Sequence, residues 1–203
     1  MKTGRIELVG PMGIGKTTFL SGWKSSATFA ASAFEGLQLM DPEREYWRDS
    51  VVTRSYFMQT VYYIHGCEVI EAAARQNSVV VSDFSLLFHH YGYSRTLREM
   101  GYLTDLEYRT LERLLNRLNE ALPPLIGAVH CKVEPSVVLA RIRSRNRPEE
   151  VAIKEDFLKI LSTAAQDMVL GLKVPVLQLD LTPAVEELSW QPFEELVRTS
   201  SAG

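Results

Sequence analysis

The chain has 203 residues, a length that fits one domain with a sizeable core, and 46% of them are hydrophobic. The formal net charge of −3 gives no general attraction to nucleic acid, and no run reaches the roughly 18 apolar residues of a membrane span. We therefore expect neither nucleic acid nor membrane as a partner. Cys67 and Cys131 lack metal-ligand spacing, and no secretory pattern opens the chain, so we expect reduced thiols in a cytoplasmic protein.

The first predicted element is a short buried strand, Ile6-Glu7-Leu8-Val9, which leads into Gly10-Pro11-Met12-Gly13-Ile14-Gly15-Lys16-Thr17. This second run matches G-x-x-x-x-G-K-[ST], the phosphate-binding loop of nucleotide-binding proteins. Its glycines let backbone N–H groups point at phosphate oxygens, Lys16 can reach the β- and γ-phosphates, and the Thr17 hydroxyl can hold Mg²⁺. The motif predicts that the chain binds ATP (or GTP) through Gly10, Gly13, Gly15, Lys16, Thr17 and Thr18.

The next segment carries a candidate for substrate chemistry. We expect the first helix to end near residues 25–26, a loop over 27–36 and a second strand over 37–40. Asp41 follows and precedes a proline, which places it at the C-terminal edge of that strand, where ligands collect in open α/β sheets. Asp41 is either a turn residue or a general base that accepts a proton from a substrate hydroxyl. Trp47, shortly after it, is either a core residue or a ligand contact.

A long helix and a buried strand come next. Residues 50–75 are expected to form one helix that carries Gln59, a residue type most often found on the surface. The β-branched run over 78–82 is typical of a strand buried on both faces. Asp83 closes this strand, and an acidic residue there, downstream of a phosphate loop, suits a second contact to Mg²⁺.

An aromatic-rich helix is expected over residues 84–99. Tyr93 within it is either a core residue or a group that stacks on a ligand. His89 and His90 lack metal-ligand spacing, so both are interpreted as structural. Together with the preceding elements, this helix continues an alternation of helices and strands.

The second half of the chain keeps that alternation. Thr104 and Glu107 form a capping box at the start of a leucine-rich helix that ends before Pro123-Pro124. The remaining elements are a strand over 125–133, a helix from Pro135, a helix over 151–170, a strand over 174–179 and a last helix capped by Thr182-Pro183. The pattern predicts a three-layer α/β/α fold with a central parallel sheet, in one domain over residues 1–203.

Four arginines at alternate positions mark the helix that begins at Pro135: Arg141, Arg143, Arg145 and Arg147. They cannot all lie on one helical face, and one interpretation is a basic, solvated helix end. The other is a charge-neutralising lid, over about residues 143–151, because guanidinium groups match phosphate oxygens in bidentate fashion. Behind a phosphate loop, the lid is the favoured interpretation.

Together these motifs resemble the deoxynucleoside kinase family of P-loop kinases, which includes the viral thymidine kinases. The resemblance extends from Ile6 to about Asp180. Besides the phosphate loop, it rests on the acidic-Pro segment from Asp41 to Trp47, on Phe57-Met58-Gln59, and on the lid-like run Arg145-Asn146-Arg147-Pro148-Glu149-Glu150. It also implies a homodimer built on the long helices.

The resemblance implies a role for each candidate residue. Asp41 would deprotonate the 5′-hydroxyl of a nucleoside, while Gln59 would hydrogen-bond its base. Tyr93 would stack on that base, and Glu150 would hold the sugar 3′-hydroxyl. The remaining implied roles are catalysis by Lys16, Arg145 and Arg147, donor binding by Arg141, substrate contact by Trp47 and Asp83, and Mg²⁺ binding by Thr17 and Asp83.

Three departures from the family pattern bear on the acceptor. Phe84 stands where the family has an Arg that reaches the reacting centre, and only eleven residues separate Trp47 from Gln59. Asp41 also replaces the usual Glu with a shorter side chain. The sequence thus predicts an ATP-dependent kinase that phosphorylates the 5′-hydroxyl of a (deoxy)nucleoside or nucleoside-like compound. The alternatives are a nucleoside monophosphate kinase, an antibiotic-modifying or biosynthetic kinase on the same scaffold, and a nucleotide-binding regulator without transfer activity.

Overall fold

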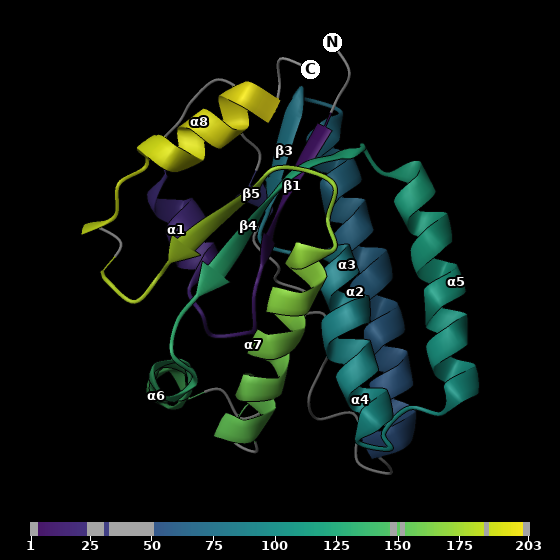
Figure 1. Ribbon diagram of the computed structural model, residues 1–203. Coiled ribbons are helices and arrows are strands. Elements are labelled where there is room, and N and C mark those ends of the chain that lie inside the picture. The colour runs from purple at the N-terminus through teal and green to yellow at the C-terminus, as the bar shows by residue number, and fades with distance from the viewer. Residues whose placement is uncertain are drawn as a thin grey trace.

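A parallel five-stranded sheet lies at the centre of the computed structural model, which describes residues 4–23, 31–32, 51–146, 150, 153–184 and 187–200. The strands are β1 (Gly4–Val9), β2 (Ala31–Ser32), β3 (Val79–Ser82), β4 (Leu125–Lys132) and β5 (Val176–Asp180). They are ordered β2-β3-β1-β4-β5, so β1 is the middle strand (Figure 1). In the register, Ile6 of β1 pairs with Val81 of β3 and Gly127 of β4. The loop that follows β1 therefore leaves the sheet at its centre.

Helices cover both faces of this sheet (Figure 1). The helical elements are α1 (Lys16–Gly22), α2 (Val51–Ala74), α3 (Leu86–Phe88), the π-helical turn η3 (His89–Ser94), α4 (Arg95–Glu99), α5 (Asp105–Ala121), α6 (Pro135–Arg145), α7 (Glu155–Leu170) and α8 (Gln191–Ser200). The α1 and α8 helices pack on one face, where Phe19 and Phe193 meet Ile6 and Leu8. On the other face α2, α5 and α7 pack against the sheet, with Val80 as a buried strand residue. The predicted three-layer α/β/α fold is confirmed.

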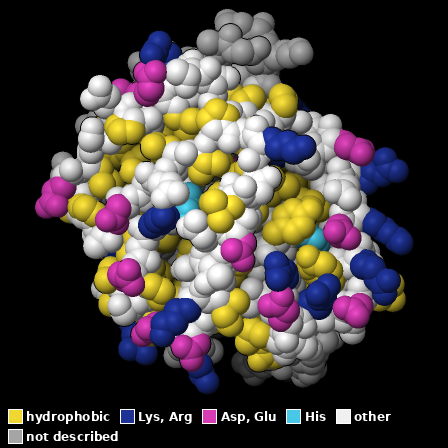
Figure 2. All heavy atoms as spheres, in the orientation of Figure 1, with side chains coloured by type: hydrophobic (Ala, Val, Ile, Leu, Met, Phe, Trp, Pro, Cys, Tyr) yellow, Lys and Arg dark blue, Asp and Glu magenta, His cyan; other side chains and the backbone are white. Residues whose placement is uncertain are grey.

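Most of the predicted elements are present with small shifts in their ends. The capping box forms as expected: the Thr104 N–H donates to Glu107 Oε2 at 2.7 Å, and the Glu107 N–H donates to Thr104 Oγ1 at 3.2 Å. The strand predicted over 37–40 lies outside the described residues. None of the described helices is long and apolar enough to cross a membrane. Acidic and basic side chains are interspersed over the face shown in Figure 2.

Three predictions about where an element begins, ends or is absent were wrong. The segment 27–36 was predicted to be a loop, yet Ala31–Ser32 pairs with β3 as an edge strand. The first helix ends at Gly22 rather than near 25–26, because Trp23 is extended. The last helix begins at Gln191 and not at Thr182-Pro183, because the Thr182 N–H is turned back to Asp180 Oδ1 at 2.8 Å. The proline in the first turn of that helix is Pro192, where a missing N–H is tolerated.

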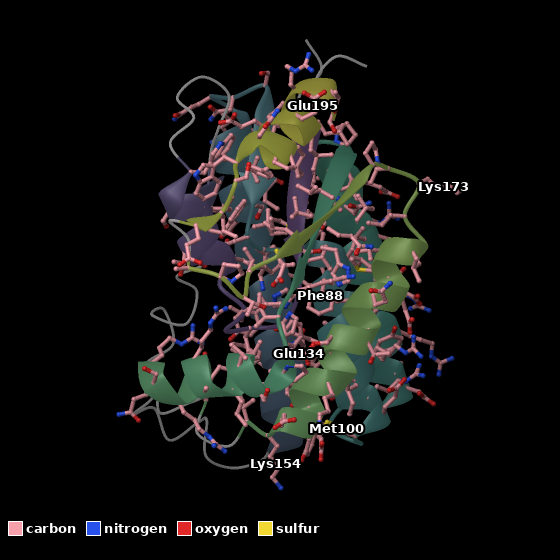
Figure 3. The ribbon with its side chains drawn as sticks, turned by 60° about the vertical axis from the view of Figure 1, so that its left-hand side comes forward. Phe88, Met100, Glu134, Lys154, Lys173 and Glu195 are labelled. Atoms are coloured by element: carbon pink, nitrogen blue, oxygen red, sulfur yellow. The ribbon has the colours of Figure 1, made fainter. Side chains whose placement is uncertain are left out.

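The segment predicted as one helix over 84–99 is divided into α3, η3 and α4. Ser85 caps the start of α3, since its Oγ accepts a hydrogen bond from the Phe88 N–H at 3.1 Å. The wide turn η3 then interrupts the ordinary helical period between His89 and Ser94. Phe88, labelled in Figure 3, lies in the interior with residues of α7. The result is a bent aromatic segment beside the carboxyl edge of the sheet.

Candidate active site

The loop after β1 has the backbone that its glycines predict. Gly13 and Gly15 adopt φ values of 75° and 105°, in the left-handed region that favours glycine. A Cβ at Gly13 would also lie 2.5 Å from Ile142 Cγ1 of α6, so a larger residue is excluded there. Lys16 begins α1 directly after this turn. The loop is therefore shaped as the phosphate-binding motif requires.

The Lys16 ammonium group lies inside this loop. Its Nζ donates to Gly10 O at 2.6 Å and to Pro11 O at 3.0 Å. Burial lowers the pKa of Lys16, while the charge of nearby Asp83 raises it. Two backbone carbonyls thus hold the cation in place beside the space that the loop encloses.

Thr17 and Asp83, the two predicted ligands of Mg²⁺, are in direct contact. The Thr17 hydroxyl donates to Asp83 Oδ2, which connects the start of α1 to the end of β3. One hydroxyl and one carboxylate fit Mg²⁺, which takes few protein oxygens and completes its shell with water and phosphate. Among the described residues no cluster of three acidic, histidine or cysteine side chains offers a metal site.

A cavity of about 680 Å³ opens above these groups. It reaches from the phosphate loop to α2, to the α3–η3 segment and to the end of α6. The residues that line it are Leu8, Gly10, Met12, Gly13, Gly15, Lys16, Thr17, Thr18, Met58, Tyr62, Asp83, Phe84, Ser85, Phe88, His89, Tyr93, Arg141, Arg145, Glu150, Ile153, Leu181, Pro183, Ala184 and Leu188. Eleven of the predicted site residues are therefore brought together: Gly10, Gly13, Gly15, Lys16, Thr17, Thr18, Asp83, Tyr93, Arg141, Arg145 and Glu150.

Aromatic rings form one wall of the cavity. The His89 ring lies between Phe84, at a centroid distance of 4.5 Å, and Tyr93, at 5.0 Å. Phe84 fits only because Gly66 of α2 has no side chain, since a Cβ there would lie 2.2 Å from the Phe84 ring. Burial, and to a lesser extent Lys16, lowers the pKa of His89 to about 3, so the imidazole is neutral near pH 7. We call Phe84, His89 and Tyr93 the aromatic wall.

The sequence interpretation of His89 as structural missed its place on this wall. A signal was present, because His89 and Tyr93 are four residues apart and share a helical face. His90, by contrast, does not line the cavity, and its Nδ1 lies 3.0 Å from the Tyr63 hydroxyl. The same hydroxyl lies 2.9 Å from Ser94 Oγ. His90 thus belongs to a buried network between α2 and η3, as the structural interpretation predicts.

The arginines of α6 have separate partners. Arg141 donates to the carbonyls of Ile14, Leu181 and Thr182 at 2.9 to 3.1 Å, so it bridges the phosphate loop and the segment after β5. Arg145 forms an ion pair with Glu150, with a shortest N–O distance of 2.6 Å. Both members of that pair line the cavity.

Gln59 is the one predicted site residue, among those the structure describes, that does not line the cavity. It is buried with 5% of its surface exposed, and its Oε1 accepts a hydrogen bond from Ser94 Oγ at 3.1 Å. Its predicted contact with a base stays a prediction. Asp41, Trp47 and Arg147 lie outside the described residues, so their predicted roles are not tested by this geometry.

Comparisons with known proteins agree with this architecture. A deoxynucleoside kinase family model matches residues 6–199. The chain is 23% identical over 146 residues to the probable deoxycytidine kinase FPV151 of Fowlpox virus (strain NVSL), and the match covers 69% of this chain and 59% of that relative. The solved structure of a deoxyadenosine kinase from M. mycoides superposes with a TM-score of 0.74 at 16% identity, over 98% of this chain and 100% of the other. With nearly its full length matched by the family model, the chain belongs to the deoxynucleoside kinase family.

Proposed function

We propose that the protein transfers the γ-phosphoryl group of ATP (or GTP) to the 5′-hydroxyl of a deoxynucleoside or nucleoside-like compound. The observation that carries the proposal is one cavity with two kinds of wall. Lys16, Thr17 and Asp83 face it from the phosphate-loop side, and the aromatic wall faces it from the α3–η3 side. The match to the deoxynucleoside kinase family and the similarity to the two named kinases support the same reaction class.

The donor side supplies electrostatic stabilisation. Lys16 would contact the β- and γ-phosphates, and Arg141 and Arg145 would lie near the donor. Thr17 and Asp83 would hold Mg²⁺, which neutralises charge on the phosphates when it is bound. We propose Arg147 as a further lid residue. Asp41 is proposed as the base that takes the proton of the hydroxyl, as the family resemblance implies.

The acceptor side favours an uncharged planar compound. Stacked rings provide dispersion and ring-edge contacts that suit a nucleobase, and Tyr93 is the proposed stacking residue. Glu150, Gln59 and Trp47 are proposed to contact the sugar and base. These proposed contacts, together with a neutral His89, suit a nucleoside better than a charged acceptor.

A nucleoside monophosphate is disfavoured as the acceptor because its dianion needs a cation on this side. The cations that line the cavity among the described residues are Lys16, Arg141 and Arg145, and each already has carbonyl or carboxylate partners. Phe84 occupies the place where the family has an Arg. Faster turnover of a nucleotide than of its parent nucleoside would reverse this assignment.

A homodimer along α2 is proposed as the oligomeric state. Phe57 and Ile64 are seven residues apart on α2, hence on one helical face, with 48% and 42% of their surfaces exposed. Apolar side chains grouped in this way are typical of a contact surface. Light scattering at several protein concentrations measures the mass directly. We also propose a cytoplasmic location, because Cys67 and Cys131 are free and buried thiols.

The reaction is tested by incubating the protein with Mg²⁺ and ATP or GTP and a panel of deoxynucleosides and nucleoside analogues. We expect 5′-monophosphates and the nucleoside diphosphate as products. A parallel panel of nucleoside monophosphates and unrelated alcohols addresses the competing kinase classes. Tight ATP binding without turnover of any acceptor would instead identify a regulator.

A further inference from the structure

A buried ion pair lies inside the central strand of the sheet. Arg5 and Glu7 are each about 1% exposed, and Arg5 Nε donates to Glu7 Oε1 at 2.7 Å. Side chains alternate along a strand, and Ile6 and Leu8 pack in the cluster with α1 and α8. Arg5 and Glu7 therefore point to the opposite face, which α2 and α5 cover. A pair of ionisable side chains buried this deeply calls for a reason beyond packing.

The ion pair continues in two directions. Toward α5, the remaining guanidinium nitrogens of Arg5 donate to Pro123 O and Asn119 Oδ1. Toward the cavity, Glu7 Oε2 accepts a hydrogen bond from Ser85 Oγ at 2.7 Å. Ser85 lines the cavity and also caps α3 through the Phe88 N–H. A continuous chain of hydrogen bonds, buried at Arg5, Glu7 and Ser85, thus connects the end of α5 to the cavity.

This chain fixes the turn that carries Asp83. Glu7 is paired in register with Ser82, the last residue of β3. Ser82 Oγ accepts a hydrogen bond from the Phe84 N–H at 3.1 Å, and Ser85 is held by Glu7. Asp83 stands between these two attachments, and its Oδ2 accepts the Thr17 hydroxyl. The direction of the Asp83 carboxylate therefore depends on a carboxylate buried in the neighbouring strand.

Stability does not by itself explain such a pair. Removing two charges from water costs about as much as their attraction returns, and apolar residues of similar volume often replace a buried pair without loss of stability. What apolar residues cannot replace is the hydrogen bond to Ser85. Carboxylates around a metal site are commonly oriented by partners of this kind.

We propose that Glu7, held by Arg5, is a positioning residue for phosphoryl transfer. Its carboxylate holds the Ser85 side chain in position. Through Ser85 it orients the turn that presents Asp83 to Thr17 and to the metal-bound donor. The proposal rests on the proposed function for the role of Asp83 in Mg²⁺ binding, and it is independent of which nucleoside is the acceptor. Glu7 touches neither donor nor acceptor in this assignment.

The test replaces the pair by apolar residues in the double variant Arg5→Met/Glu7→Leu. Two quantities are compared with wild type: the thermal midpoint of unfolding, and the ratio of ATP affinities with Mg²⁺ and with EDTA. We expect a thermal midpoint close to or above that of wild type. The Mg²⁺ enhancement of ATP affinity should fall by about tenfold or more, the range for loss of a partner that orients a metal ligand. A stable double variant with the wild-type enhancement would overturn the proposal.

A second variant keeps the test decisive if the double variant does not fold. Ser85→Ala removes the bond to Glu7 and leaves the ion pair intact, so it should show the same loss of Mg²⁺ enhancement. An unchanged enhancement in folded Ser85→Ala overturns the proposal equally. Where the double variant folds, adding Ser85→Ala to it should cause no further loss, because the two changes interrupt one chain.

Thr104→Ala is the matched stability control. It removes the cap of α5 at a residue that does not line the cavity, and it should lower the thermal midpoint while leaving the Mg²⁺ enhancement as in wild type. Because ATP affinity is measured without an acceptor, these results stand even if wild-type protein phosphorylates no nucleoside. In that event the acceptor assignment fails and the positioning role of Glu7 is still decided.

Discussion

The Met12 N–H donates a hydrogen bond to the Tyr93 hydroxyl across 2.6 Å, and this contact joins the phosphate loop to the aromatic wall. Tyr93 lies on η3, more than 80 residues along the chain from the loop. Burial raises the pKa of Tyr93, so the hydroxyl stays protonated and accepts this bond near pH 7. One side chain thus lines the cavity and supports the loop that is proposed to hold the donor.

Tyr93→Phe separates these two roles. The ring stays, so we expect the KM of the acceptor to change little. Loss of the bond to Met12 should raise the KM of ATP by about two- to tenfold, equivalent to the net value of one hydrogen bond. Steady-state kinetics with each substrate varied in turn would measure both constants. Tyr91→Phe, at an exposed neighbouring ring, is the control, and an equal effect there would contradict the assignment.

Lys16→Ala should lower the rate of transfer by roughly 10²–10³ while the protein stays folded. The ammonium group is held by loop carbonyls and its burial is unfavourable to the charge, so we expect it to serve phosphate binding rather than the stability of the core. Removing such a group commonly costs about 3 to 4 kcal/mol of transition-state stabilisation. Single-turnover rates and a thermal melt measure the two expectations. Near-normal turnover in a folded variant would show that the loop does not serve catalysis.

Asp41→Asn tests the proposed general base. The amide keeps the shape and removes the basic oxygen, so turnover should fall by roughly 10²–10⁴. ATP affinity and thermal stability should stay close to wild type, because the donor is held by other residues. Rapid-quench kinetics together with calorimetric ATP titration would separate these quantities. If turnover stays within about twofold of wild type, Asp41 is not the general base. Glu43 and Asp83 would then be the next candidates for that role.

Gly66→Ala should disturb the aromatic wall from outside the cavity. Alanine is the better helix former, yet its Cβ would lie 2.2 Å from the Phe84 ring. We expect a loss of roughly 1 to 3 kcal/mol in the free energy of unfolding, as for overpacked cores, and a raised KM for the acceptor. Urea denaturation and kinetics measure both. The double variant Gly66→Ala/Phe84→Leu should recover stability, and no recovery would place the strain elsewhere.

Stability should decrease as the pH falls below about 6.5, the ordinary pKa of histidine. Burial lowers the pKa of His89 to about 3 and that of His90 and His130 to about 4. Between these values the unfolded chain binds protons that the folded protein does not, so the free energy of unfolding rises with pH. Each histidine contributes a slope of at most about 1.4 kcal/mol per pH unit.

Urea denaturation at pH 7.5, 6.0 and 5.0 would measure this dependence. His130→Gln removes one of the three imidazoles, at a position that does not line the cavity. The free energy of unfolding should then depend less steeply on pH. Equal stability at all three pH values would contradict the buried, neutral state of these imidazoles.

The donor side of the candidate site could be predicted from the sequence, because short local motifs indicate it. The loop motif predicts the roles of Lys16 and Thr17, and a β-branched run that ends in Asp83 predicts a buried strand with an acidic residue suited to Mg²⁺ at its end. The family resemblance is confirmed by the model match over residues 6–199. These parts depend on short segments whose residues act within a few positions of one another.

The parts that sequence reasoning missed depend on contacts between distant segments. Phe84 requires the space above Gly66, and neither residue signals the other in the sequence. The place of His89 on the wall depends on η3, where the helical period changes. Thr182-Pro183 resembles a helix start in the sequence, but the Thr182 N–H donates to the Asp180 side chain and the helix begins only at Gln191.

The ion pair of Arg145 with Glu150 has a consequence for ionic strength. A phosphoryl group that recruits Arg145 must displace a carboxylate at 2.6 Å, so binding exchanges one anionic partner for another. Attraction between the nucleotide and this arginine is therefore offset by the separation of an existing pair, and both terms are screened by salt. The affinity for the donor should then depend less steeply on added salt than the number of arginines near the cavity suggests. The carboxylate that is released stays on the cavity wall as an acceptor for hydroxyl groups.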